Sequence, residues 1–121
     1  MIRAIVAGVV LLSMSAVSAH AADAVHGADR FKIMCATCHA IDPAQKKMGP
    51  NLKGIVGRKA GSAEGATYSA AMKSAGWTWD KAKLEAFLAD PRKTLPGTTM
   101  MLGVSNASDR ADIIAYLETL K

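Results

Sequence analysis

The most constraining feature of this 121-residue chain is the spacing of its two cysteines and one adjacent histidine. Cys35 and Cys38 are separated by two residues, and His39 follows directly. Two thiols three positions apart on a helical turn project to the same side, so both can reach one ligand with the imidazole beside them. The rest of the chain has to be arranged around whatever these three side chains bind.

Four kinds of site share parts of this pattern. A thioredoxin-like redox pair requires a strand–helix–strand context, and no strand is indicated on either side of the motif. A zinc site takes four ligands, whereas this cluster supplies three and His26 is a poor candidate for the fourth. A disulfide across so short a loop leaves His39 without a role. Cys-x-x-Cys-His is typical of covalent haem attachment, so we predict haem c bound through two thioethers, with His39 as an axial iron ligand.

A second axial ligand has to come from further along the chain. Methionine is the obvious candidate, because a thioether paired with histidine raises the reduction potential toward values suited to electron transfer. The candidates are Met34, Met48, Met72, Met100 and Met101. The last two follow a Pro-Gly loop that can aim a side chain inward, and spacing alone does not choose between them.

The N-terminal segment has the pattern of a secretory signal peptide. Arg3 precedes an uncharged aliphatic run over residues 4–12, and Ala19-His20-Ala21 offers a cleavage site. We therefore expect a cleaved signal peptide at 1–21, a single domain at 22–121 and a periplasmic location. The apolar run is short for the roughly 20 residues that span a bilayer. An uncleaved anchor stays open as the alternative, because no lysine, arginine, aspartate or glutamate lies between Arg3 and Asp23.

The remaining domain of about 100 residues is near the lower limit for a self-sufficient core, and an apolar cofactor would complete it. Removing residues 1–21 leaves 14 basic and 10 acidic side chains. This mild positive balance favours acidic protein partners, and no basic stripe with interleaved aromatics indicates nucleic-acid binding.

Apolar periodicity and capping residues predict an all-α domain of about four helices. We expect helices over residues 24–36, 67–75, 81–89 with Asp80 as cap, and 107–120 with Asn106 as cap. Pro91 is placed beyond the end of the third helix. Residues 41–66 and 94–104 are expected to be long loops, which need a rigid object to pack on.

The domain resembles class I cytochromes c of the mitochondrial and alphaproteobacterial type, from about residue 27 to residue 120. The motifs that carry the resemblance, besides residues 35–39, are Gly-Pro-Asn-Leu-Lys-Gly at 49–54, Gly-Arg-Lys-Ala-Gly at 57–61, Tyr-Ser-Ala-Ala at 68–71, Trp-Thr-Trp at 77–79, Leu-Pro-Gly-Thr-Thr-Met at 95–100 and Arg-Ala-Asp-Ile-Ile-Ala-Tyr-Leu at 110–117. The resemblance implies the cytochrome c fold, with helices and long loops wrapped around one covalently attached haem.

The resemblance also implies roles for particular residues. His39 and Met100 would be the axial ligands, and the carbonyl of Pro50 would accept a hydrogen bond from His39. The propionate donors would be Arg58, Tyr68 and Trp79. Gly27 and Phe31 would meet Tyr116 where the first and last helices cross.

The chain departs from the family pattern around the methionine ligand. Phe87 and Met72 stand where many members have tyrosine and asparagine, so the potential does not carry over. The segment after Met100 is one residue short, and the lysine run of mitochondrial members is replaced by Ser-Asn-Ala at 105–107. Because Lys47, Arg92 and Lys93 still match rim positions, we expect electrostatic partner docking that is weaker than in mitochondrial relatives.

The function implied is that of a soluble monomeric electron carrier, not an enzyme, without stable membrane insertion. The implied donors are a quinol-oxidising cytochrome complex or a periplasmic dehydrogenase, and the acceptor is a terminal oxidase or reductase. A haem peroxidase or gas-binding protein needs an open iron position, which a Met100 ligand would fill. A haem subunit permanently docked to a larger enzyme stays open as a further alternative.

Overall fold

The computed structural model describes residues 21–121, so nearly all of the predicted signal peptide lies outside the described residues. Five helices appear in this part of the chain. They are α1 (Ala24–Met34), α2 (Ala70–Lys73), α3 (Lys81–Ala89), α4 (Pro91–Thr94) and α5 (Ala107–Thr119). The prediction of an all-helical domain is confirmed, because residues 21–121 form no sheet and only one isolated bridge, between Lys59 and Thr78. None of these helices is long and apolar enough to cross a membrane.

Every helix begins at a side chain that caps it. The capping residues, in chain order, are Asp23, Ser69, Asp80, Asp90 and Asn106. Each accepts a hydrogen bond from a backbone N–H in the first turn, which satisfies a donor that the helix itself leaves unpaired. The caps predicted at Asp80 and Asn106 are confirmed.

The helix over 67–75 was predicted too long, and α4 was missed. α2 spans four residues, because the segment before Ala70 is extended up to the Ser69 cap. α4 begins at Pro91, which was expected merely to follow the third helix. Proline is well suited to the first position of a helix, where its missing N–H costs nothing, and Asp90 supplies the cap.

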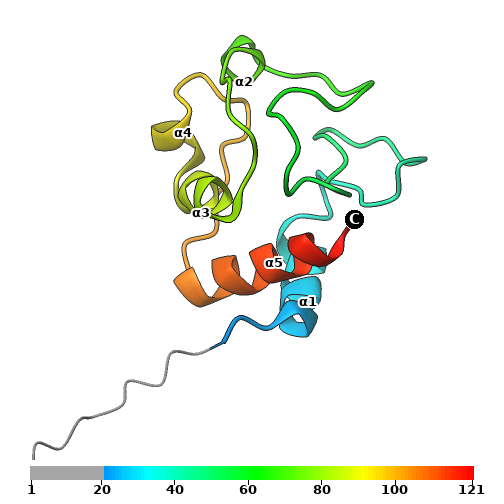
Figure 1. The fold of residues 1–121 in the computed structure, drawn as a ribbon, viewed down its shortest axis with the longest axis vertical. Coiled ribbons are helices and arrows are strands. Elements are labelled where there is room, and N and C mark those ends of the chain that lie inside the picture. The colour runs from blue at the N-terminus through cyan, green and yellow to red at the C-terminus, as the bar shows by residue number, and fades with distance from the viewer. Residues whose placement is uncertain (1–20) are drawn as a thin grey trace, which may run out of the picture.

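The crossing of α1 and α5 joins the two ends of the domain (Figure 1). Gly27 is buried there, and a Cβ atom at this position would lie 1.9 Å from the carbonyl oxygen of Asp112. One turn further along, the rings of Phe31 and Tyr116 meet edge to face at 5.5 Å. The expected contact between Phe31 and Tyr116 is confirmed, and Gly27 lies at the same crossing against the backbone of Asp112 and Ile113, where its absent side chain lets the two helices approach.

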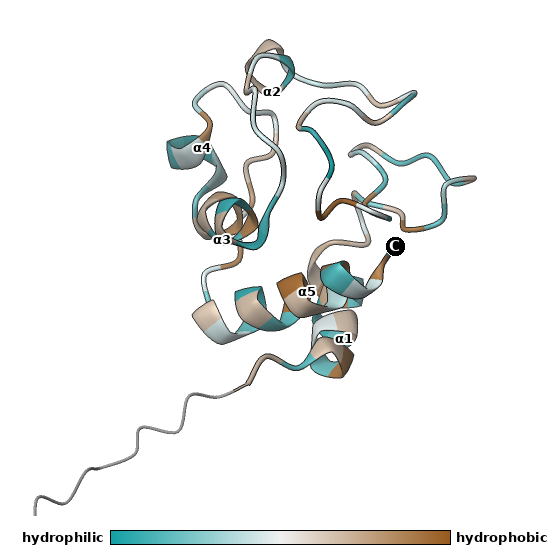
Figure 2. Cartoon of the chain, in the orientation of Figure 1, coloured by the Kyte–Doolittle hydropathy of each residue, from teal (hydrophilic) through white to brown (hydrophobic). Residues whose placement is uncertain are grey.

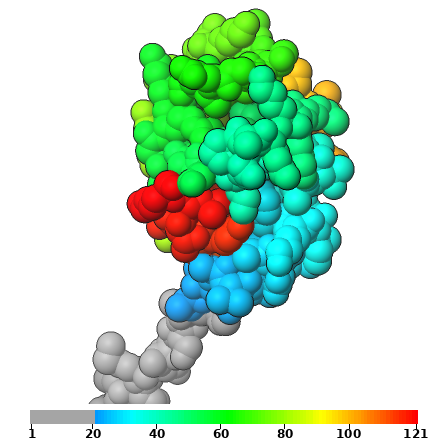
Figure 3. Space-filling model, turned by 90° about the vertical axis from the view of Figure 1, so that its right-hand side faces the viewer, coloured from blue at the N-terminus to red at the C-terminus, as the bar shows by residue number. Residues whose placement is uncertain are grey.

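A buried carboxylate reinforces this crossing. Asp112 is 4% exposed, accepts a hydrogen bond from the backbone N–H of Asp23 at 2.8 Å and lies 2.6 Å from His26 Nδ1. His26 is thus engaged with α5. Figure 3 shows the C-terminal end of the chain, in red, at the surface beside the first described residues, in blue.

Long loops and α2–α4 cover the rest of the molecule above the α1–α5 crossing (Figure 1). Figure 2 shows apolar residues on α3 and α5, whereas the long loop after α1 is mostly polar. Seven of the twelve buried core residues lie on α1, α3 and α5, and the loops contribute the other five: Ile55, Ala60, Trp79, Leu95 and Val104. Each of these loop residues packs in the same cluster as the helix residues, and this contact holds its loop against the helices.

The close approach at Gly27 yields a prediction about stability. Gly27→Ala should lower the free energy of unfolding by about 3 kcal/mol, because the new methyl group forces the helices apart. Guanidinium unfolding of the holoprotein measures this, with Lys32→Ala on the exposed side of α1 as the control, expected to change stability by less than about 0.5 kcal/mol. Alanine favours a helix over glycine by roughly 0.5–1 kcal/mol. A stabilised Gly27→Ala variant would show that the crossing is not this tight.

Candidate functional site

The cysteines and the histidine lie on one turn that continues α1. Cys35 caps the end of α1, and its carbonyl oxygen accepts hydrogen bonds from the backbone N–H groups of Cys38 at 3.1 Å and His39 at 2.9 Å. Both thiols are half-buried and are not joined in a disulfide. The turn therefore presents two thiols and an imidazole together, as the spacing predicted.

The protonation of Cys35 argues against thiol–disulfide exchange. Burial, and secondarily the neighbouring Cys38, raises the pKa of Cys35 to about 11. Exchange requires a thiolate, and reactive cysteines in such proteins have a lowered pKa. Cys35 therefore lacks the lowered pKa that marks a thiol used for exchange.

The His39 ring is held in one orientation and one tautomer. Its Nδ1 lies 2.8 Å from the carbonyl oxygen of Pro50, and since a carbonyl only accepts, Nδ1 carries the proton. Nε2 is then left with a lone pair. Burial lowers the pKa of His39, with the Pro50 hydrogen bond acting in the opposite direction. Gly49 closes the other side, where a Cβ atom would lie 2.4 Å from the ring Cε1. A neutral, oriented imidazole is what a metal ligand requires.

These side chains line an interior cavity of about 470 Å³, which is within the usual range for small-molecule and cofactor sites. Seven of the eight predicted site residues line it: Cys35, Cys38, His39, Pro50, Tyr68, Trp79 and Met100. Nine of the twelve buried residues of the hydrophobic core line it as well. No lysine, arginine, aspartate or glutamate does. The core is thus a shell around a mostly apolar space.

The two adjacent methionines differ in position. Met100 is half-buried and lines only this cavity, whereas Met101 is 61% exposed and also lines a second cavity. Thr98 is buried, and its hydroxyl oxygen accepts a hydrogen bond from the backbone N–H of Met100 at 3.3 Å. This tether was not predicted, because a threonine in a loop gives no sign of burial in the sequence.

Arg58 lies outside the cavity lining, although it was predicted in the same group as Tyr68 and Trp79. Its guanidinium donates hydrogen bonds to the backbone carbonyls of Asn51 at 2.7 Å and Lys53 at 2.5 Å. Its own carbonyl accepts a hydrogen bond from the backbone N–H of Trp79 at 2.8 Å. Arg58 therefore ties the loop after Pro50 to the segment that carries Trp79.

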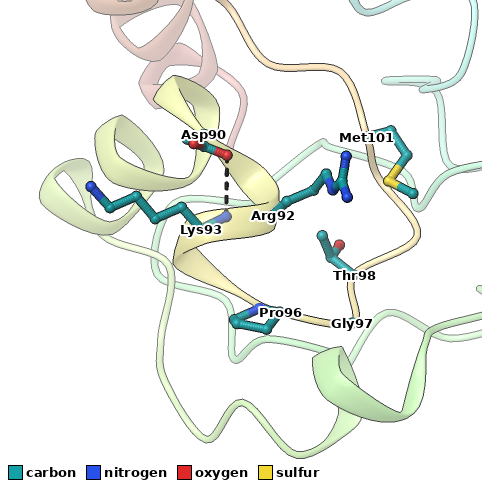
Figure 4. Close-up of a pocket in the computed structure, with 7 residues that line it drawn as sticks. All are labelled: Asp90, Arg92, Lys93, Pro96, Gly97, Thr98 and Met101. Atoms are coloured by element: carbon teal, nitrogen blue, oxygen red, sulfur yellow. Dashed lines mark hydrogen bonds between the residues drawn. The ribbon is translucent and has the colours of Figure 1, made fainter.

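The second cavity, of about 630 Å³, adjoins the first and is shown in Figure 4. Thr98 and Met101 line both cavities. Arg92 and Lys93 are exposed on its α4 side, and the Asp90 carboxylate there accepts the hydrogen bond from Lys93 N that caps α4. The second cavity carries charge but has neither thiol nor imidazole, so it is not the cofactor site.

The first cavity fits a mostly apolar group that forms covalent bonds to two thiols and carries a metal ion bound by imidazole and thioether. Thiols, an imidazole and a thioether all line it, and thioether and imidazole ligands suit iron in an electron-transfer site. A group bound in this cavity would also make van der Waals contacts with the core side chains that line it.

Comparisons with known proteins agree with this fit. The family model for cytochrome c matches residues 24–121. Cytochrome c2 of Rhodomicrobium vannielii is 48% identical over 105 residues, which cover 84% of this chain and 83% of that protein. Cytochrome c2 of Rhodoblastus acidophilus is 46% identical over 91 residues, covering 74% of this chain and 85% of that protein.

A solved structure shows the same fold. Cytochrome cH from Methylobacterium extorquens superposes with a TM-score of 0.73 at 46% identity, covering 80% of this chain and 98% of that one. The chain therefore belongs to the cytochrome c family, whose members are electron-transfer proteins and not enzymes, and its cofactor is haem c, held through two thioethers at Cys35 and Cys38.

Proposed function

We propose that this protein is an exported, monomeric electron carrier in which His39 and Met100 are the axial ligands of the haem iron. The observation that carries the proposal is the convergence of both thiols, the imidazole and the Met100 thioether on one cavity. When bound, haem supplies a one-electron couple, and the protein supplies ligands, burial and a contact surface.

His39 and Met100 are held in ways that limit reorganisation. The hydrogen bond to Pro50 and the contact with Gly49 keep the imidazole from rotating. Met100 is tethered through its backbone to Thr98, which is itself buried. Ligands fixed before and after electron transfer need little rearrangement between the two redox states, which is what an electron carrier requires.

Tyr68, Trp79 and Arg58 are proposed to stabilise the haem propionates. The Tyr68 hydroxyl oxygen accepts a hydrogen bond from Ala63 N at 3.0 Å, which leaves its own proton available for donation to a carboxylate. Trp79 is 6% exposed and lines the cavity. Arg58 acts from outside the lining: its guanidinium donates to the carbonyls of Asn51 and Lys53, and its own backbone carbonyl accepts a hydrogen bond from the backbone N–H of Trp79. A buried carboxylate requires donors or a positive charge of this kind.

The proposed location is the periplasm, after removal of residues 1–21. The proposed donors are a quinol-oxidising cytochrome complex or a periplasmic dehydrogenase, and the proposed acceptor is a terminal oxidase or reductase. The exposed Lys47, Arg92 and Lys93 support acidic protein partners. Their small number supports weak electrostatic docking.

The ligand assignment predicts different outcomes for the two methionines. In Met100→Ala, the ferric protein should lose the weak absorption at the red end of the visible spectrum that marks methionine–iron ligation, and the reduced iron should bind carbon monoxide. The potential should fall by on the order of 100 mV, within the roughly 0.8 V range that axial ligands span. Met101→Ala is the matched control and should retain the band. Loss of the band only in Met101→Ala would reverse the assignment.

The packing of Gly49 predicts an effect on His39. In Gly49→Ala, the new methyl group should turn the imidazole and weaken its hydrogen bond to Pro50, lowering the free energy of unfolding of the holoprotein by about 2 kcal/mol. Guanidinium unfolding and the intensity of the low-spin haem spectrum measure this. Met48→Ala, next to it and 82% exposed, should change neither. Equal behaviour of the two variants would contradict the role of Gly49.

If residues 1–21 are removed during export, the mature protein should have the mass of residues 22–121 plus haem. After expression of the full chain with haem-attachment machinery, mass spectrometry of the periplasmic fraction should find a haem protein beginning at about Ala22. Ala21→Phe should block cleavage, because signal peptidase accepts only small residues at that site. A membrane-bound product that retains residues 1–21 would support the uncleaved anchor instead.

A further inference from the structure

The methionines of the described chain all gather at one place. Five lie within residues 21–121, and every one of them lines the haem cavity: Met34, Met48, Met72, Met100 and Met101. They come from α1, α2 and two loops, so the gathering is made by the tertiary structure. The proposed ligation of the iron uses one thioether, which leaves the other four without a role.

Exposure divides these five residues into two groups. Met72 and Met100 are half-buried, whereas Met34, Met48 and Met101 are 40%, 82% and 61% exposed. We call the three exposed residues the outer methionines. Because they line the cavity and also reach solvent, they lie at its opening. Methionine often fills gaps in a core, but side chains as exposed as Met48 and Met101 fill no gap.

The outer methionines carry the same functional group as Met100 and are more accessible to solvent. A thioether takes an oxygen atom from hypochlorous acid or a hydroperoxide and becomes a sulfoxide. With hypochlorous acid, the sulfur gives up two electrons and gains the oxygen, while chloride and a proton are released. An oxidant in solution therefore finds three accessible thioethers for the one half-buried thioether of the proposed ligand.

The contacts of Met34 predict that it reacts last among the outer methionines. Arg30 Nη2 donates to its sulfur at 3.5 Å, which engages a lone pair that the oxygen transfer uses. The same guanidinium group pairs with Asp109 at 3.0 Å, so the donor is fixed to α5. Met34 is also the least exposed of the three. We expect the order of oxidation to be Met48, then Met101, then Met34.

Sulfoxidation also changes the polarity of the cavity opening. The sulfoxide is polar, whereas the thioether is apolar. Ferric haem carries one more positive charge than ferrous haem, and a more polar surrounding stabilises the more highly charged form. Oxidation of the outer methionines should therefore lower the reduction potential while the iron keeps its ligands.

We propose that the outer methionines are a sulfoxidation site, which takes up two-electron oxidants such as hypochlorous acid in place of Met100 and lowers the haem potential once oxidised. This inference rests on the proposed function, because it takes Met100 as the iron ligand. Methionine sulfoxide reductases reverse the change, so the modification is a reversible one.

The first test is the order of oxidation in the ferric holoprotein. The protein is treated with about three equivalents of hypochlorous acid, one for each outer methionine, and its peptides are sequenced by mass spectrometry. Fragmentation of the peptide separates Met100 from Met101. Met48 and Met101 should be mostly sulfoxide, with Met72 and Met100 about fivefold less oxidised. Equal or preferential oxidation of Met100 would overturn the inference.

A variant without the outer methionines should leave the ligand as the next target. In Met34→Leu with Met48→Leu and Met101→Leu, the side chains keep their approximate size and apolar character but accept no oxygen. The same dose should oxidise Met100 about threefold more than in wild type. The absorption band of methionine–iron ligation should weaken in parallel. Wild-type oxidation of Met100 in this triple variant would contradict a protective role.

A matched control places thioethers at similarly exposed positions away from the cavity. Val25 and Ile33 are 77% and 68% exposed and do not line it. The triple variant with Val25→Met and Ile33→Met added should again take up oxidant, but its potential should stay constant. In wild type, the dose should shift the equilibrium between the two iron states about threefold toward the ferric form. An unchanged potential in oxidised wild type, or an equal shift in the control, would overturn the inference.

The proposed ligand set is tested apart from the sulfoxidation site. The absorption band of the untreated wild type depends on Met100 and not on the outer methionines. Absence of that band before any oxidant is added would refute the proposed ligation. The order of oxidation among the methionines would still be measurable, and it decides the inference by itself.

Discussion

The rest of the structure depends on the packing of core side chains around one apolar cavity. Most of the buried hydrophobic residues also line the cavity, so in this domain the core and the cofactor site are the same set of side chains. A domain of about 100 residues has little other apolar surface to bury. The thioethers at Cys35 and Cys38 make the filling group permanent. Stability and redox function are therefore consequences of one packing arrangement.

The crossing of α1 and α5 closes this arrangement at the chain ends. Gly27 lets the helices touch, the rings of Phe31 and Tyr116 meet edge to face across the contact, and Asp112 binds both the Asp23 backbone and His26. The same helix α1 ends at Cys35, which begins the attachment turn. The helix crossing thus positions the thiols, because Cys35 directly follows α1 and no loop separates it from Phe31 at the crossing.

No lysine, arginine, aspartate or glutamate of the described chain lines the haem cavity, whereas the second cavity beside it is lined by Arg92, Lys93 and Asp90. Thr98 and Met101 line both cavities. The positive charge that we propose attracts acidic partners therefore lies outside the haem cavity. Long-range attraction of this kind mainly raises the association rate.

Local spacing and side-chain chemistry are enough to predict the attachment motif, the helical class, the caps at Asp80 and Asn106 and the family. The sequence did not predict α4, the short extent of α2 or the burial of Thr98. A proline can begin a helix or follow one, and a loop threonine can be buried or exposed, without any difference in the local sequence. Spacing also left Met100 and Met101 equivalent, and only their different burial separates them. Which distant side chains share the cavity, and that Arg58 lies outside its lining, could be seen only in the folded chain. Those relations depend on how loops far apart in the sequence pack on one another.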